Sequence, residues 1–264
     1  MSPAYAHIAS RGAHGEIGNG VYERLVEARR EVWIGEDRSG LIRSARLGWS
    51  FFTEQQRERW RSALAQEQRE SLGVSMDLFA PRCLAGLSEF VAALPHDPVE
   101  LAAALDATRG LDMHTIRELM GEVLVPEQRR RELYAVAAAL PGAQASAAGE
   151  DQLGRAGRVL SRVERDVRTE LIFDADSLEL LGYRDVLVDP AAAYAPAGAV
   201  VGWTSYLTRE MVAALQGGTP PVPGPPCSPP GAGRGTQVEA GFSLGTGYFT
   251  ELAPDPERRL TPQR

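Results

Sequence analysis

The chain has 264 residues, of which 44% are hydrophobic and 24% are charged, and its net charge is −7. This is the composition of a globular protein, and the length allows one large domain or two small ones. All basic residues are arginines, and none of their clusters is free of nearby acids, which argues against a nucleic-acid partner. No apolar run approaches the roughly 18 residues that span a bilayer, and no secretory signal opens the chain. We therefore expect a soluble chain without a transmembrane segment.

The first part of the chain predicts an antiparallel meander. Residues 31–34 and 41–43 are β-branched and aromatic runs on either side of the acidic turn 36–40, which is the pattern of a β-hairpin. A charged stretch that begins at Thr53 predicts an exposed helix. The expected strands are 5–10, 21–28, 31–35 and 41–47, and the expected helix is 53–70.

Four short helices are predicted in the middle of the chain. Apolar residues recur there at three- and four-residue steps. Asp97 and Pro98 supply an N-cap and a first-turn proline, Pro126 separates two helices, and Pro141 ends the last one. We expect these helices to pack on one face of the sheet, and they cover residues 84–94, 97–105, 113–124 and 126–140.

Strands return after residue 150. Val159, Val163, Val167 and Leu171 fall at four-residue steps that suit a helix, but the surrounding residues favour strands. We predict a hairpin of 169–173 with 178–188, a last strand at 198–207 and a terminal helix at 208–216. The order of strands, helices and strands predicts an α+β fold in which a curved antiparallel sheet packs on a group of short helices.

The composition changes at residue 217. Seven prolines lie between residues 220 and 230, and such a segment buries too little apolar area to fold by itself. We therefore divide the chain into an α+β domain, 1–216, and a Pro/Gly-rich tail, 217–264, which we predict to be disordered. This tail is either a spacer or a polyproline II ligand for an aromatic-lined groove.

Several short stretches follow one another in a characteristic order: residues 31–34 with 40–43, the helix opener 94–98, residues 170–174 and residues 198–204. In this order and spacing the chain resembles an uncharacterised family of high-GC bacteria that is known by a locus-tag label only. The resemblance spans roughly residues 5–210. Members of that family carry a transmembrane helix ahead of this region, so the resemblance implies an extracytoplasmic, membrane-anchored domain, although this sequence lacks the helix.

The order of strands and helices is also similar to the half-barrel fold of periplasmic lipoprotein carriers and sigma-factor regulators. This second resemblance is at the level of the fold. In those proteins a curved antiparallel sheet wraps helices around an apolar cavity. The resemblance implies a lipid or another apolar molecule as ligand.

Motifs for catalysis and metal binding fail their structural requirements. Residues 241–245, Gly-Phe-Ser-Leu-Gly, match the nucleophile elbow, but no histidine follows them. The four histidines have no metal-ligand spacing, and Asp174 and Asp176 fit a β-turn better than a calcium loop. We predict that Cys83 and Cys227 are free thiols and do not form a disulfide framework. We expect no metal, no cofactor and no catalytic residue.

Aromatic residues gather where the first sheet meets the helices. The bland interpretation places them in the core, and the functional one makes them the walls of an apolar pocket. We predict a non-enzymatic domain that binds or senses an apolar ligand such as a lipid, or a protein partner. The alternatives are an enzyme with an unrecognised site and a structural interaction domain. The candidate pocket residues are Trp33, Trp49, Phe51, Phe52, Trp60 and Phe79.

Overall fold

A computed structural model of the chain describes residues 5–18, 21–35, 40–64, 74–79, 86–189 and 195–213. Within these ranges it describes all side chains except those of residues 16–18, 21–23, 60–64 and 74–79. The proline-rich tail and both cysteines lie outside the described residues. The described helices include none that is long and apolar enough to cross a membrane.

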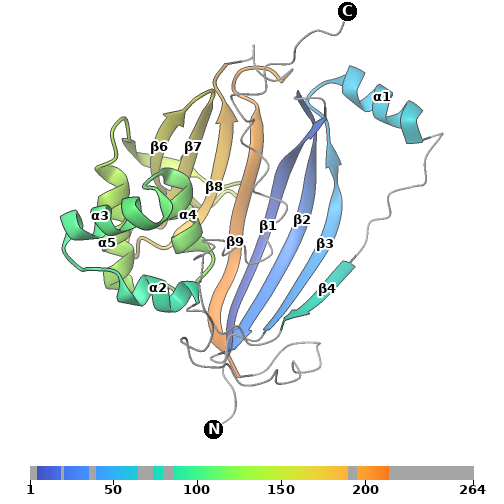
Figure 1. Ribbon diagram of the computed structural model, residues 1–264. Helices are drawn as coiled ribbons and strands as arrows, with labels where there is room; N and C mark the ends of the chain where they lie inside the picture. Colours follow the sequence, from blue (N-terminus) through green and yellow to red (C-terminus); the bar gives the residue numbers. More distant parts are fainter. Residues whose placement is uncertain are drawn as a thin grey trace, which may run out of the picture.

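The described strands form one antiparallel sheet in the order β4-β3-β2-β1-β9-β8-β7-β6-β5 (Figure 1). The sheet is curved and does not close, so β4 and β5 are its edges. The first and last strands, β1 and β9, are neighbours at its centre. The strands are β1 Tyr5–Gly18, β2 Val21–Gly35, β3 Gly40–Ser50, β4 Val74–Phe79, β5 Gln144–Glu150, β6 Ala156–Glu164, β7 Val167–Phe173, β8 Leu180–Leu187 and β9 Val200–Val212.

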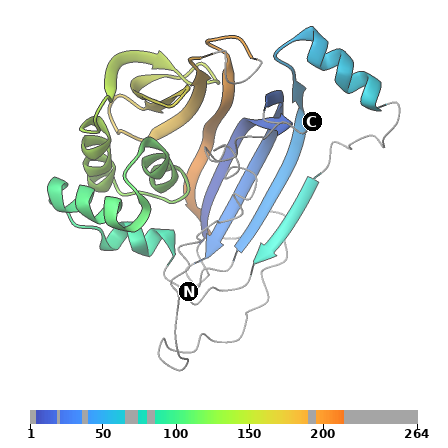
Figure 2. The ribbon, with the colours of Figure 1, turned by 45° about the horizontal axis from the view of Figure 1, so that its top comes forward.

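The helices lie between β4 and β5 in sequence, apart from α1, which follows β3. Both ribbon views show α2–α5 over the part of the sheet formed by β6–β9 and not over β1–β3, while α1 stands away from the sheet (Figures 1 and 2). The helices are α1 Glu54–Leu64, α2 Leu87–Ala93, α3 Pro98–Arg109, α4 Met113–Gly121 and α5 Glu127–Ala138.

Side-chain caps fix where two of these helices begin. The Asp97 carboxylate accepts hydrogen bonds from the backbone N–H groups of Val99 and Glu100, at 2.9 and 3.0 Å, and Pro98 occupies the first helical position of α3. Asp112 accepts from the Thr115 N–H at 2.7 Å and starts α4. Both caps satisfy donors that the helix itself leaves unpaired.

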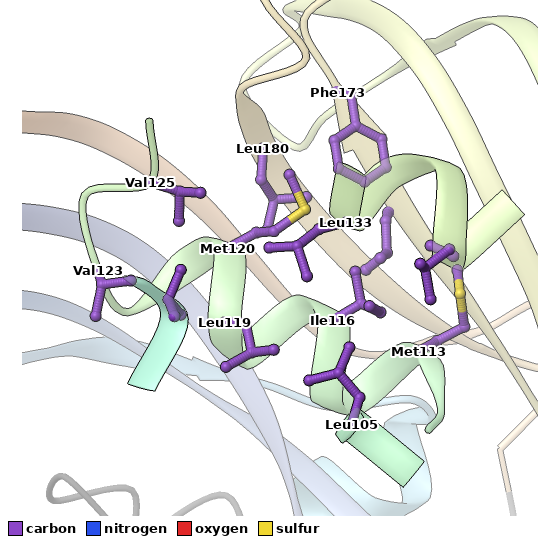
Figure 3. Packing of buried hydrophobic residues seen from close by; sticks show 14 of the residues in the cluster. Leu105, Met113, Ile116, Leu119, Met120, Val123, Val125, Leu133, Phe173 and Leu180 are labelled. Carbon is purple, nitrogen blue, oxygen red and sulfur yellow. The ribbon is translucent and has the colours of Figure 1, made fainter. Parts of the chain in front are cut away.

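The main core fills the space between the helices and β6–β9 (Figure 3). Leu105, Ile116 and Leu133 from three helices meet Phe173 and Leu180 from the sheet, and each of these side chains is fully buried. Burying a large aliphatic side chain contributes about 1.5–3 kcal/mol, so this layer holds the helices on the sheet.

The predicted fold class is confirmed: the chain is α+β with a curved antiparallel sheet and short helices on one face. Both predicted hairpins are present, since Val32 pairs with Ile42 and Leu171 pairs with Tyr183. The connection at Asp174 is wider than the predicted β-turn, because the Leu178 N–H donates to the Asp174 carbonyl at 3.2 Å; the Asp174 carboxylate accepts from Ser177 N–H at 2.8 Å.

Two predictions of local structure need correction, and two strands were missed. The expected strands 21–28 and 31–35 are one strand, β2. The expected helix 208–216 is wrong as far as Val212, because β9 continues that far and pairs with β1; residues 214–216 lie outside the described part. The edge strands β4 and β5 were not predicted from the sequence.

Candidate functional site

The two faces of the sheet have different chemistry. Residues directly opposite each other in an antiparallel pair share a face, so the register assigns every strand residue to one side. On the face away from the helices, here called the outer face, ion pairs alternate with small residues. Glu170, for example, accepts from Arg168 Nε at 2.7 Å and from Arg184 Nε. The same face also carries buried residues, among them Trp33 and Leu41, so it is polar over β7 and β8 and apolar where β2 and β3 meet.

The opposite, helix-side face contains rows of side chains that run across the strands. One row joins Asp185 of β8, Gly202 of β9, His14 of β1, Val26 of β2 and Trp49 of β3. The helices cover the β8 end of this row, while its β1–β3 end extends beyond them (Figure 1).

The next row has the small residues of the face at its centre. It joins Tyr183 of β8, Thr204 of β9, Gly12 of β1, Ala28 of β2 and Arg46 of β3. Glycine and alanine leave a low surface between the bulky ends of the row. We call nine of the helix-side residues of the first three strands the β1–β3 floor: Ser10, Gly12, His14, Val26, Ala28, Arg30, Ser44, Arg46 and Trp49.

Helix α4 forms the wall beside this floor. The guanidinium of Arg117 lies 4.1 Å above the ring of Tyr183 and donates to Asp185 Oδ2 at 3.1 Å. Asp185 Oδ1 accepts a second hydrogen bond, from Thr169 Oγ1 at 2.7 Å. The carboxylate is therefore satisfied by a cation and a hydroxyl, as a partly buried charge requires.

His114 lies at the solvent side of this cluster, where its neighbours enclose the ring only in part. Its Nδ1 contacts a nitrogen of the Arg117 guanidinium, which has only N–H donors, so Nδ1 accepts and the imidazole is neutral. Burial and the adjacent Arg117 charge both lower the pKa of His114. The described contacts hold charges in place and bring no activated nucleophile to the cluster.

One ion pair joins the wall directly to the floor. Arg30 of β2 donates to Glu122, the C-cap residue that follows α4, at 2.8 Å, and both side chains are mostly buried. One turn earlier, Glu118 accepts from Arg109 at 3.0 Å, and burial raises the pKa of Glu118. The floor is thus apolar and small at its centre, with charged groups along its border.

The structure separates the predicted aromatic pocket residues. Trp33 is on the outer face, where its ring stacks on His7, whereas Trp49 is on the helix-side face. Trp33 pairs with Leu41, eight residues from Trp49 along β3. Phe51 and Phe52 follow β3 and are half-buried, and Phe52 packs against a small cluster that contains Leu187 and Val201. The side chains of Trp60 in α1 and Phe79 in β4 lie outside the described residues.

The other residues of the floor, and those of the adjoining wall, were not recognised in the sequence. Gly12 and Ala28 carry no chemical signature, and Asp185 and Arg117 are common residue types in unremarkable contexts. Strict alternation along each strand would have separated Trp33 from its neighbours on the other face. It would not have placed the floor beside α4, because that position depends on the pairing of β1 with β9.

A pocket of about 160 Å³ lies where β8 and β9 separate, between Arg155, Leu181, Leu207 and Thr208. This volume is small compared with the roughly 300–1,000 Å³ of pockets that bind drug-sized ligands. Among the residues that the structure describes, no three histidine, cysteine or acidic side chains are arranged to hold a metal ion. The serine motif at 241–245 lies outside them.

No family model, no curated protein and no solved structure matches the chain. The resemblances noted in the sequence therefore stay predictions. Function is argued below from the geometry of the β1–β3 floor.

Proposed function

We propose that the chain is a non-enzymatic binding domain that holds an amphipathic ligand, largely apolar, on the β1–β3 floor. The supporting observation is the unequal cover of the sheet. Helices α2–α5 pack on β6–β9, while no described helix lies over the same face of β1–β3, where Ala28 and Trp49 are half-buried (Figures 1 and 2). An apolar surface of this kind beside a helix is a common place for a ligand.

The border of the floor suits a molecule with a polar end. Arg30 and Glu122 lie on the side of α4, and Arg46 lies 5.9 Å from the ring of Trp49 on the side of β3. The apolar part of a ligand would rest on the small side chain of Ala28, beside Gly12, whose side-chain position is filled by Thr204 Oγ1. A lipid has both an apolar chain and a polar head, and is the ligand class that we propose.

Native mass spectrometry tests this proposal on the full chain, purified without detergent and incubated with a bacterial lipid extract. Ala28→Phe places a ring at the centre of the floor. Ala45→Phe is the matched control, because Ala45 lies on a neighbouring strand, pairs with Arg29 and faces the outer side. Both alanines are half-buried.

We expect a mass excess in the lipid range that disappears on denaturation, persists in Ala45→Phe and is lost in Ala28→Phe. An unliganded mass in the parent chain would contradict the proposal, and so would equal binding by both variants. Circular dichroism of each variant establishes that loss of binding is not loss of fold.

A further inference from the structure

The sheet opens between β8 and β9, and the pocket of about 160 Å³ lies in this opening. The β8–β9 pairing ends at Gly182 and Ser205. Just beyond that pair each strand has an extra residue, since Leu181 has no partner in the β7–β8 register and Leu207 has none in the β1–β9 register. Such β-bulges bend a strand, can end its pairing and are frequent beside active sites. The two bulges therefore account for the opening.

Two arginines line the pocket, and both are held by backbone carbonyls beside the bulges. Arg155 Nη2 donates to the Leu181 carbonyl at 2.7 Å, and Arg209 Nη2 donates to the Leu180 carbonyl. Arg209 Nη1 donates to the carbonyl of Met120, near the end of α4, at 2.6 Å. The Arg209 side chain is only 6% exposed. The positions of both guanidinium groups are thus fixed by the fold.

Neither guanidinium has used all of its five N–H donors. Arg155 bonds through Nε and Nη2, which also bind the Asp151 carboxylate, and its Nη1 has no acceptor among the described residues. Arg209 Nη1 has two N–H groups and one described acceptor, the Met120 carbonyl. Two N–H groups of Arg155 and one of Arg209 therefore lack an acceptor in the part of the chain that the structure describes.

A carboxylate of the chain already contacts one of these arginines. Glu179 Oε1 accepts from Arg209 Nε at 3.2 Å and lies 3.1 Å from Nη2. Guanidinium groups bind carboxylates and phosphates through the same donors. The Glu179 side chain is 42% exposed, and an exposed ion pair is weak. An oxyanion from solution can therefore replace it on Arg209.

The pocket also has the size and polarity that suit a small anion. A cavity of roughly 150 Å³ holds a benzene-sized molecule, and a phosphate or a short carboxylate is no larger. Thr208, which lines the pocket as well, adds a hydroxyl to the donors of the two arginines. An apolar ligand would leave these donors unpaired, which is unfavourable.

We infer that the opening between β8 and β9 is a binding site for a small oxyanion, a phosphate or a carboxylate, which Arg155 and Arg209 hold and for which Glu179 is the internal competitor. None of the residues that line the pocket belongs to the β1–β3 floor, so the inference does not rest on the proposed function.

Isothermal titration calorimetry of the full chain with inorganic phosphate and, separately, with acetate tests this inference and decides between the two anions. Sodium chloride keeps the ionic strength constant, so screening of surface charges is the same in each titration. Glu179→Ala removes the competing carboxylate. Glu127→Ala is the matched control, because Glu127 is also exposed, at 57%, and pairs with Arg131 outside the pocket. Arg155→Gln removes one of the two cations.

We expect one anion to bind per chain, and Glu179→Ala to tighten its binding about two- to fivefold, the factor by which an exposed ion pair competes. Glu127→Ala should leave the affinity unchanged, and Arg155→Gln should weaken it at least about tenfold, the loss of a charge-assisted hydrogen bond. Equal affinities in the two glutamate variants would overturn the inference, and so would the absence of saturable binding of either anion. Because a gain in Glu179→Ala cannot come from unfolding, this comparison decides the matter even if Arg155→Gln does not fold.

Discussion

Gly121 ends α4 without a side chain, and the hydroxyl of Tyr206 occupies the space beside it. A β-carbon added at Gly121 would lie 1.8 Å from that oxygen and 2.5 Å from the ring carbon that bears it. Tyr206 is buried in the main core, and burial raises its pKa. The helix approaches the sheet this closely because one residue is glycine and the other is a neutral phenol.

Gly121→Ala should therefore destabilise the chain by about 1–3 kcal/mol, the usual cost of overpacking a core. Urea unfolding of the variant and its parent measures the difference. Adding Tyr206→Phe removes the hydroxyl contact and should recover part of the loss. A double variant no more stable than expected from adding the two separate effects would contradict this explanation.

His114 makes stability depend on pH. Burial and Arg117 lower its pKa from the ordinary 6.5, so the unfolded chain takes up a proton first as the pH falls. The contribution of His114 to the free energy of unfolding is constant above pH 6.5. It decreases as the pH falls from 6.5 to the lower pKa that His114 has in the folded state.

We expect the urea midpoint of the parent chain to fall between pH 7 and pH 5.5 by more than that of His114→Gln, which cannot be protonated. Parallel pH dependences in the two proteins would show that the contact with Arg117 does not govern the titration. Both proteins contain the same acidic residues, including Glu118, whose pKa is raised by burial. Subtracting one pH dependence from the other therefore cancels the contribution of these acids.

At the scale of one element, α3 depends on its N-cap, the residue that precedes the helix. Asp97 satisfies two backbone N–H groups that the helix leaves unpaired. Asp97→Ala should cost about 0.5–2 kcal/mol, while Asp97→Asn should retain most of the stability, since asparagine also caps helices. Val99→Ala is a control on the same turn, because Val99 is 77% exposed. Thermal unfolding of the three variants decides whether the cap or the general helix propensity matters.

The elements also show how far the sequence predicts the structure. The sequence predicted the cap at Asp97, the helix boundary at Pro126 and the two hairpins, because helix caps, prolines and turns depend on local residues. Strand β5, Gln144–Glu150, has no β-branched or aromatic residue and forms only because β6 pairs with it. The sequence at the end of β9 predicts a helix, but Thr208 and Met211 pair with Ala9 and Ala6 of β1. Tertiary pairing decides their structure.

The candidate site was less predictable than the fold. Gly12, Thr204 and Ala28 come together across β9, β1 and β2, although Thr204 is almost 200 residues from Gly12. No local pattern records such a pairing. The aromatic residues were grouped by closeness in sequence, and alternation along β2 and β3 then distributes Trp33 and Trp49 to opposite faces.

The whole molecule depends on the seam between β1 and β9, because it joins the β4–β1 part of the sheet to the β9–β5 part. Gly12 lies in this seam. A β-carbon there would be 2.7 Å from both Thr204 Oγ1 and the Trp203 carbonyl oxygen.

Gly12→Ala should therefore destabilise the chain by more than about 1 kcal/mol, in the range of overpacking. Gly48→Ala in β3 is the matched control, since nothing lies within 4 Å of its added β-carbon. We expect it to stay within about 0.5 kcal/mol of the parent, as surface substitutions usually do. Equal denaturant midpoints for both variants would show that stability is no more sensitive to substitution in the seam than in β3.

The seam also has a consequence for synthesis on the ribosome. Strand β1 is among the first segments made, and its partner β9 is complete only when Val212 has been added. At roughly 5–20 residues per second, the edge of β1 that β9 will cover waits about 10–40 seconds without its partner. During that time the β1–β2 hairpin offers a free strand edge to other nascent chains. A chaperone that shields β1 until translation has passed Val212 would raise the yield of folded protein more than one that acts after release.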